Sequence, residues 1–254
     1  PNRIRDGRFS WNGRNYSLPL NDGTKKNAIH GSALYAAWEP HPPRFRDDVV
    51  ELSATFHGDA TKDGKPFWPT PQTLTVTYRL GRGFLDIVAE VEAGAGPVPM
   101  GLGYHPYFRL EPFGGADARP WVAARKMWEL AESLPTGKLA LPTGDLDYAT
   151  PKPIAARTPD DVYTELDPRG VRGDLRLVAG ITSKSGQKRF EIWTSPEYRE
   201  IVVFVPAHRQ AIAIEPYTCT TDAINLQARG VDAGWITVPA SQTWRATVHL
   251  EYHG

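Results

Sequence analysis

The sequence contains little that would tie it to an oxidising compartment or to a charged partner. Its single cysteine, Cys219, excludes an intramolecular disulfide and a cysteine-based zinc site, and it fits a reducing compartment. Lysine and arginine together number 29, as do aspartate and glutamate, so no net charge favours nucleic acid or an anionic membrane. We therefore expect a small-molecule partner, with no nucleic acid and no membrane.

Long apolar runs are also missing. No run approaches the roughly 20 apolar residues that a membrane-spanning helix needs, and the opening Pro1-Asn2-Arg3-Ile4 has no signal-like character. We expect a cytoplasmic protein, either a monomer or a homodimer. Because no initiator methionine is present, we also expect residues to precede Pro1 in the natural chain.

What the chain does contain is a β pattern. Apolar and polar residues alternate over 72–80 and 84–92, which predicts an antiparallel hairpin with one solvated face. Residues 8–18 predict another hairpin, because Asn12-Gly13 suits a type I′ turn. Further strands are predicted over residues 49–56, 174–178, 189–194, 201–205, 211–214, 235–238 and 244–252.

Many short strands, 23 glycines, 23 prolines and almost no long helical period predict an all-β fold, a large antiparallel β-sandwich. No linker interrupts the 254 residues, so a single domain over 1–254 is expected. Residues 57–71 and 134–148 are interpreted as loops. Residues 121–133 have helical propensity, although their surroundings are all β.

A carboxylate follows a row of small side chains in residues 211–225. If this stretch is a strand, Ile212 and Ile214 face the core, while Ala211, Ala213 and Glu215 face the other way. Small side chains beside a charged one leave space. We interpret that face as the wall of a pocket.

Residues 101–108 repeat the arrangement with an imidazole. As a strand, they would present on one face Gly101, Gly103, His105 and Tyr107. A carboxylate and an imidazole from two strands in one cleft form an acid/base pair that can move protons on a small molecule. A structural buried carboxylate and a core histidine are the alternatives.

Four short motifs follow one another along the chain. They are Asn2-Arg3-Ile4, Asn27-Ala28-Ile29-His30-Gly31, Gly103-Tyr104-His105-Pro106-Tyr107-Phe108, and Ile214-Glu215-Pro216 with Asp222-Ala223 and Asn225. In this order they resemble the aldose 1-epimerase (galactose mutarotase) family over nearly the whole chain, which implies the galactose mutarotase-like supersandwich. That family has several strands before its Asn-Arg-Ile motif, so we expect those N-terminal strands to be lacking here.

The resemblance implies a mutarotase that interconverts the α and β anomers of free aldohexoses such as glucose or galactose. Glu215 would be the general base at the C1 hydroxyl and His105 the general acid at the ring oxygen, with no cofactor and no metal. His105 must then be protonated while Glu215 is ionised. Ordinary pKa values of ~6.5 and ~4.3 make that state accessible near neutral pH.

The resemblance also assigns sugar-binding residues. Arg3 and His30 would hold sugar hydroxyls, and Asp160, which we prefer to Asp161, would accept hydrogen bonds from them. Candidates to stack on the apolar face of the sugar are Trp68, Tyr107 and Trp193, each with a place in the hydrophobic core as the alternative.

Two other functions stay open. Some relatives act on hexose 6-phosphates, and the arginines that could bind a phosphate are Arg5, Arg8 and Arg209. A non-catalytic sugar-binding module on the same fold is the second alternative, although it would gain little from an acid and a base together. The histidines show no metal-ligand spacing, so we expect no metal site.

Overall fold

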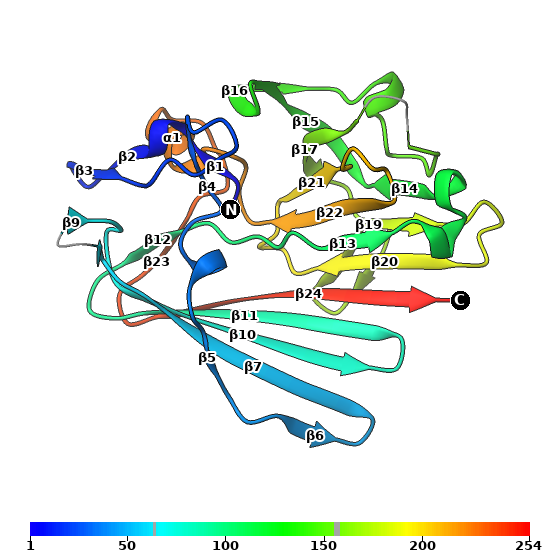
Figure 1. The fold of residues 1–254 in the computed structure, drawn as a ribbon, viewed down its shortest axis with the longest axis horizontal. Helices are drawn as coiled ribbons and strands as arrows, with labels where there is room; N and C mark the ends of the chain where they lie inside the picture. Colours follow the sequence, from blue (N-terminus) through cyan, green and yellow to red (C-terminus); the bar gives the residue numbers. More distant parts are fainter. Residues whose placement is uncertain (63–64, 155–157) are drawn as a thin grey trace. The chain divides into compact units, whose positions relative to one another are not determined.

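The computed structural model describes residues 1–62, 65–154 and 158–254, and strands dominate this part of the chain (Figure 1). Within it, the one α-helix is α1 (Ala223–Ala228). The strands pair in antiparallel registers. The predicted all-β, antiparallel class is therefore confirmed. None of the helices in these described residues is both long enough and apolar enough to cross a membrane.

The described chain divides into two compact units. Unit 1 consists of Pro1–Arg79, Ile87–Leu102 and Thr218–Ala246. Unit 2 consists of Leu80–Asp86, Gly103–Tyr217 and Thr247–Gly254. The prediction of one domain over residues 1–254 stays a prediction.

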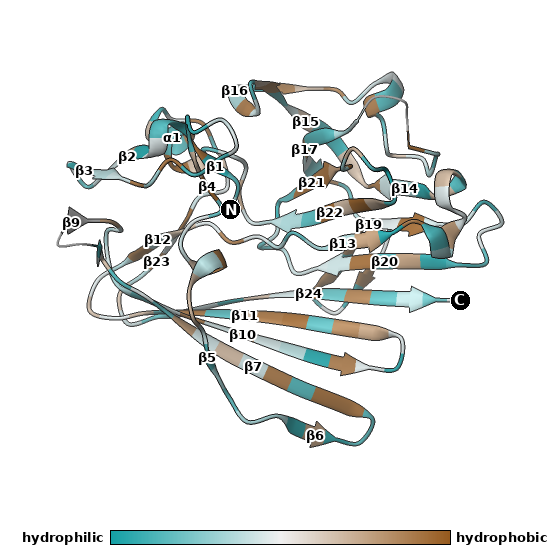
Figure 2. Cartoon of the chain, viewed as in Figure 1, coloured by the Kyte–Doolittle hydropathy of each residue, from teal (hydrophilic) through white to brown (hydrophobic). Residues whose placement is uncertain are grey.

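Unit 1 contains most of a run of strands that lie side by side in the order β11, β10, β7 and β5, with β6 beside β7, and the long strands among them are β7, β10 and β11 (Figure 1). Their bounds are β5 (Glu39–Pro40), β6 (Arg44–Arg46), β7 (Val49–Gly58), β10 (Gln72–Gly81) and β11 (Phe84–Ala93). Brown segments along β10 and β11 mark apolar residues of the alternating pattern, and β7, predicted as a strand over residues 49–56, carries brown segments as well (Figure 2). The predicted hairpin over residues 72–92 is confirmed.

Short strand pairs complete unit 1. They are β1 (Arg3–Ile4) with β4 (Ala28–Ile29), β2 (Arg8–Trp11) with β3 (Arg14–Ser17), β8 (Thr61–Lys62) with β9 (Lys65–Pro66), and β12 (Val98–Met100) with β23 (Ile236–Val238). The turn between β2 and β3 has positive φ at Asn12 (47°) and Gly13 (75°), as a type I′ turn requires. The loop predicted over 57–71 contains β8 and β9, and its residues 63–64 lie outside the described residues.

Unit 2 is built around a six-stranded sheet in the order β13, β22, β21, β17, β15, β16. The bounds are β13 (Tyr107–Arg109), β15 (Ala124–Ala131), β16 (Leu134–Ala140), β17 (Asp160–Leu166), β21 (Glu200–Phe204) and β22 (Ala211–Tyr217). Strands β14 (Arg119–Val122), β19 (Leu175–Thr182), β20 (Arg189–Thr194) and the final strand β24 (Thr243–His253) follow one another in a second run, with β18 (Val171–Arg172) beside β19.

Four local expectations were wrong. Residues 121–133 form β14 and β15 instead of a helix, because burial of side chains such as Trp121 and Trp128 outweighs helical propensity. The first Pro-Thr-Gly lies in β16, an edge strand, where a proline needs no ladder partner. In residues 211–225 the strand ends at Tyr217, and Ala223 begins α1. His105 lies just before β13 and not inside a strand.

Candidate active site

One face of the six-stranded sheet in unit 2 carries the predicted acid/base pair. Across adjacent strands Tyr107 pairs with Ala213, Ala213 with Phe204, and Phe204 with Asp160. Directly paired residues point to the same face of a sheet. Asp160, Phe204, Ala213 and Tyr107 therefore form one row across four strands.

Glu215 and His105 lie next to this row. Glu215 is two residues from Ala213 along β22, so it points to the same face of the sheet, and His105, two residues before Tyr107, contacts Glu215 there. The His105 Nε2 and Glu215 Oε1 atoms are 3.2 Å apart. The imidazole stacks on the Tyr107 ring, with 4.8 Å between centroids, and meets Phe204 edge-on at 6.2 Å.

The two side chains differ sharply in exposure. The Glu215 side chain is 2 % exposed, whereas the His105 side chain is 32 % exposed. Tyr107, beside it, is 54 % exposed. The carboxyl group is therefore buried, whereas the imidazole that contacts it is partly exposed to solvent.

Burial moves the pKa values of the pair in opposite directions. It raises the pKa of Glu215 to about 8; a hydrogen bond from Tyr217 opposes this rise, and the negative charge of Asp160 adds to it. Burial lowers the pKa of His105, against a smaller opposing effect from Asp160. Both shifts favour the arrangement in which a shared proton lies on Glu215, whereas ordinary pKa values favour the one in which it lies on His105.

Gly101 and Gly103 do not leave the open space that we inferred from the sequence. A Cβ atom on Gly103 would lie 2.2 Å from the Tyr217 ring, and one on Gly101 would lie 2.4 Å from Cys219 Sγ. The space beside these glycines is thus filled by protein side chains. Interpreting them as the lining of an open pocket was wrong.

Of the two neighbouring aspartates, Asp160 is the one that acts on the pair. It is exposed at the start of β17, and its charge affects both His105 and Glu215. Asp161 is 7 % exposed and, one residue further along the strand, points to the opposite face. Asp160 therefore lies on the face of the acid/base pair, and its contact with sugar hydroxyls stays a prediction.

Arg3 and His30 lie together within unit 1. Arg3 pairs with Ile29 across β1 and β4, and the His30 backbone N–H donates to the Asn2 carbonyl at 2.9 Å. The Arg3 guanidinium donates to Asn2 Oδ1 at 3.2 Å and lies 3.7 Å from Asp22 Oδ2. The motifs that contain Arg3 and His30 therefore form one local structure, in which strand pairing and polar contacts hold Arg3 in place.

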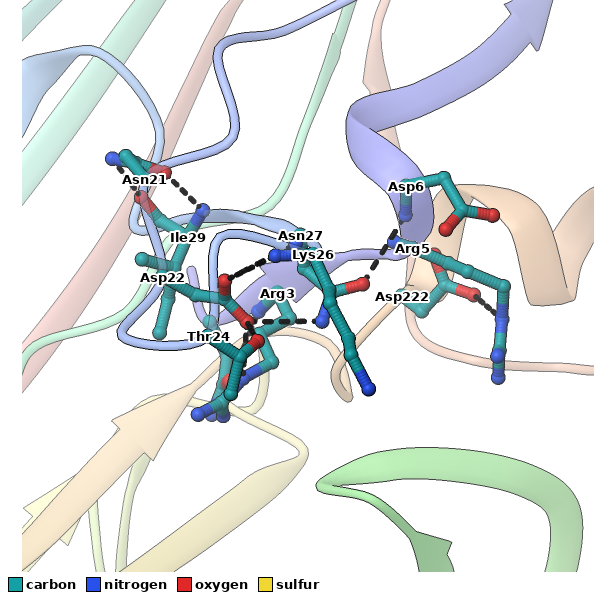
Figure 3. A network of polar contacts seen from close by, with 11 residues as sticks. Arg3, Arg5, Asp6, Asn21, Asp22, Thr24, Lys26, Asn27, Ile29 and Asp222 are labelled. Carbon is teal, nitrogen blue, oxygen red and sulfur yellow. Dashed lines mark hydrogen bonds and ion pairs between the residues drawn. The ribbon is translucent and has the colours of Figure 1, made fainter.

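Polar contacts hold this structure in place, as Figure 3 shows. Asp22 accepts hydrogen bonds from Asn27, Thr24 and the Lys26 backbone. Burial alone would raise the pKa of Asp22, but these hydrogen bonds outweigh it and hold the pKa far below the ordinary value. Asn27 in turn accepts from the Asp6 backbone at 3.2 Å.

The fourth motif joins the same network through Asp222. Its Oδ1 accepts from the Arg5 backbone at 2.9 Å and from Asn225 Nδ2 at 2.7 Å. Its side chain is buried, and its backbone has a φ of 56°. Sequence reasoning did not assign these structural roles to Asp22, Asn27 and Asp222, although their presence inside or beside the motifs was a usable signal.

Trp68 contributes to the apolar cluster of unit 1. Its ring lies 5.2 Å from the Phe9 ring and 6.2 Å from the Trp235 ring, and its indole N–H donates to the Pro99 carbonyl at 3.0 Å. This packing accounts for its position. Stacking of Trp68 on a sugar stays a prediction, as do the hydroxyl contacts of Arg3 and His30.

Two of the arginines considered for phosphate are engaged with protein acceptors. Arg5 lies 3.7 Å from Asp222 Oδ2 within unit 1. Within unit 2, Arg209 donates to the Ile154 carbonyl at 3.3 Å. Neither contact supports a phosphate site.

A separate group in unit 2 has the composition of a metal site. Ligand atoms of Glu191, Glu251 and His253 lie within 4.8 Å of one another. However, Arg172 donates to Glu251 Oε2 at 2.7 Å, and the Trp193 indole donates to Glu191 Oε2 at 3.2 Å. Because protein donors already use these carboxylate oxygens, we assign no metal to this group.

Comparisons with known proteins identify the family and the fold. The family model described as aldose 1-epimerase matches residues 1–251. The uncharacterised protein YihR of Escherichia coli K12 is 26 % identical over 89 % of this chain and 69 % of its own length. The galactose mutarotase of Sus scrofa is 27 % identical over 57 % of this chain, and the match spans only 39 % of that protein.

Solved structures share the fold. A galactose mutarotase-like protein from Clostridium acetobutylicum superimposes with a TM-score of 0.87 at 24 % identity, covering 100 % of this chain and 77 % of that one. The predicted galactose mutarotase-like fold is therefore confirmed.

Proposed function

Because this chain belongs to the aldose 1-epimerase family, we propose that it is a mutarotase that interconverts the α and β anomers of free aldohexoses such as glucose or galactose. The observation that carries the proposal is the 3.2 Å approach of His105 Nε2 to Glu215 Oε1. An imidazole and a carboxyl group at this distance, one of them open to solvent, can give and take protons on one small molecule.

Anomer exchange needs two proton transfers. The base removes the proton of the C1 hydroxyl while the acid protonates the ring oxygen, so the C1–O5 bond breaks and a free aldehyde forms. After rotation about C1–C2, the same two groups act in reverse and the ring closes on the other face. Glu215 is the base and His105 the acid in opening, and their roles exchange in closing.

One shared proton suits this cycle. Opening starts from ionised Glu215 with protonated His105, and it leaves protonated Glu215 with neutral His105. The raised pKa of Glu215, about 8, and the lowered pKa of His105 favour the second state. Closing moves the same two protons in the opposite directions, so the pair ends the cycle in the protonation state in which it began.

The charge beside the pair favours a neutral substrate. Asp160 is exposed and acts electrostatically on both Glu215 and His105. Its negative charge would repel a phosphorylated sugar but can accept hydrogen bonds from hydroxyls. We accordingly propose free aldoses over hexose phosphates, Asp160 as a hydroxyl acceptor and exposed Tyr107 as the stacking ring. A cytoplasmic location goes with this proposal, since the one cysteine suits a reducing compartment.

The proposal is tested by anomer exchange of fresh α-glucose and α-galactose, followed by polarimetry or magnetisation-transfer NMR. Glu215→Gln should lose most of the acceleration while still binding sugar, because an amide cannot take the C1 proton. Glu200→Gln is the matched control, because Glu200 is also fully buried and accepts hydrogen bonds from Trp128 and Thr164. This variant should exchange anomers at the rate of the unaltered protein. Undiminished exchange in Glu215→Gln would refute the assignment.

A further inference from the structure

The carboxyl group of Glu215 has a second partner besides His105. Tyr217, two residues further along β22, donates its hydroxyl to Glu215 Oε2 at 2.5 Å. Tyr217 is 1 % exposed. One carboxylate oxygen is thus held by a buried phenol, while Oε1 is the oxygen 3.2 Å from His105 Nε2.

The Tyr217 ring occupies space that exists only because residue 103 is glycine. Gly103 forms an isolated antiparallel bridge with Tyr217. A Cβ atom at Gly103 would lie 2.2 Å and 2.6 Å from two carbons of the Tyr217 ring, closer than packed atoms allow. Any side chain at this position would displace the ring and, with it, the hydroxyl that reaches Glu215.

The same bridge sets the register of the pair. Gly103 lies opposite Tyr217, Tyr107 lies opposite Ala213, and the Tyr104 N–H donates to the Pro216 carbonyl at 3.2 Å. In this register the residue opposite Glu215 is His105. One backbone pairing therefore aligns the acid with the base and seats the phenol against the carboxylate.

We propose that Tyr217 is a positioning residue that fixes the Glu215 carboxylate toward His105, and that Gly103 provides the space this requires. The inference rests on the proposed mutarotase function for its kinetic consequences, but the contact itself is independent of it. A hydroxyl donated to a carboxylate stabilises the ionised form and limits rotation of the group. Tyr217 thus opposes part of the effect of burial, so without it Glu215 would be ionised, and able to act as a base, only at a still higher pH.

The test is Tyr217→Phe, which removes one oxygen atom from a buried ring. The titration of Glu215, followed by carbon-13 NMR of the carboxyl groups, should move to higher pH, and kcat should fall about tenfold or more with KM little changed. The pH at which the rate of anomer exchange falls on the alkaline side should move to higher values together with the Glu215 pKa. Gly103→Ala should produce the same shifts, and the double variant should be no worse than the more impaired single one.

Tyr163→Phe is the matched control, since it removes a hydroxyl that donates to the Leu146 carbonyl at 2.7 Å from another buried ring. It should leave the Glu215 titration where it is. If Tyr217→Phe leaves both the titration and the rate profile unchanged, the positioning role is wrong. If the titration shifts but the unaltered protein exchanges no anomers, the positioning role holds and the proposed function fails.

Discussion

The raised pKa of Glu215 makes stability depend on pH in a way that one substitution should remove. The folded-state pKa is about 8, against an ordinary value of 4.5. A carboxyl group whose pKa rises on folding stabilises the folded state fully below its unfolded pKa, and this contribution is lost as pH rises through the folded value. The protein should therefore lose stability from about pH 4.5 upward until Glu215 is ionised.

The effect of Glu215 on stability is best measured above pH 6.5. Because burial lowers the pKa of His105 from 6.5, this residue contributes a stability that increases with pH only up to about 6.5 and is constant beyond it. Between about pH 6.5 and about pH 9, Glu215 then acts without an opposing change in His105. At about 1.4 kcal/mol per pH unit, levelling off around the pKa, the loss amounts to about 2 kcal/mol.

The assay is urea unfolding followed by tryptophan fluorescence, with the eight tryptophans as the signal, at several pH values across this window. The free energy of unfolding of Glu215→Gln, subtracted from that of the unaltered protein, cancels the other titrating groups. The difference should change by about 2 kcal/mol, with the unaltered protein losing stability as pH rises. Asp145→Asn, at an exposed carboxyl group, is the control and should give a flat difference. A flat difference for Glu215→Gln as well would show that Glu215 is already ionised at pH 6.5, and the reasoning would fail.

Two further outcomes are expected. The rate of anomer exchange should follow a bell-shaped pH profile, because the pair is active only when it carries one proton. The rate should fall below the lowered pKa of His105 and again above about pH 8. A rate that keeps rising past pH 9 would contradict a Glu215 pKa of about 8. Asp222→Ala should lower the free energy of unfolding by about 1–3 kcal/mol, because the Arg5 N–H and the Asn225 amide lose a buried acceptor. Asp222→Asn keeps an acceptor and tolerates positive φ, so it should lower the free energy of unfolding by less in the same urea titration. Equal losses of stability in the two variants would rule out the hydrogen bonds as the cause.

Local sequence patterns predicted most of the strands. Alternation over residues 72–92 and the Asn12-Gly13 turn depend on side chains a few positions apart, so they are visible without tertiary contacts. The same reasoning failed for residues 121–133. There, burial of Trp121 and Trp128 among distant segments selected strands over the helix that propensity favoured.

By itself, the sequence predicted Glu215 and His105 as an acid/base pair that two strands present into one cleft, because strand periodicity and four motifs pointed to them. Only the tertiary structure decided that Gly103 accommodates the Tyr217 ring, that the register sets His105 opposite Glu215, and that burial raises the pKa of Glu215 and lowers that of His105. These features arise where strands far apart in the chain pair and exclude water, and burial, unlike periodicity, has no local signature.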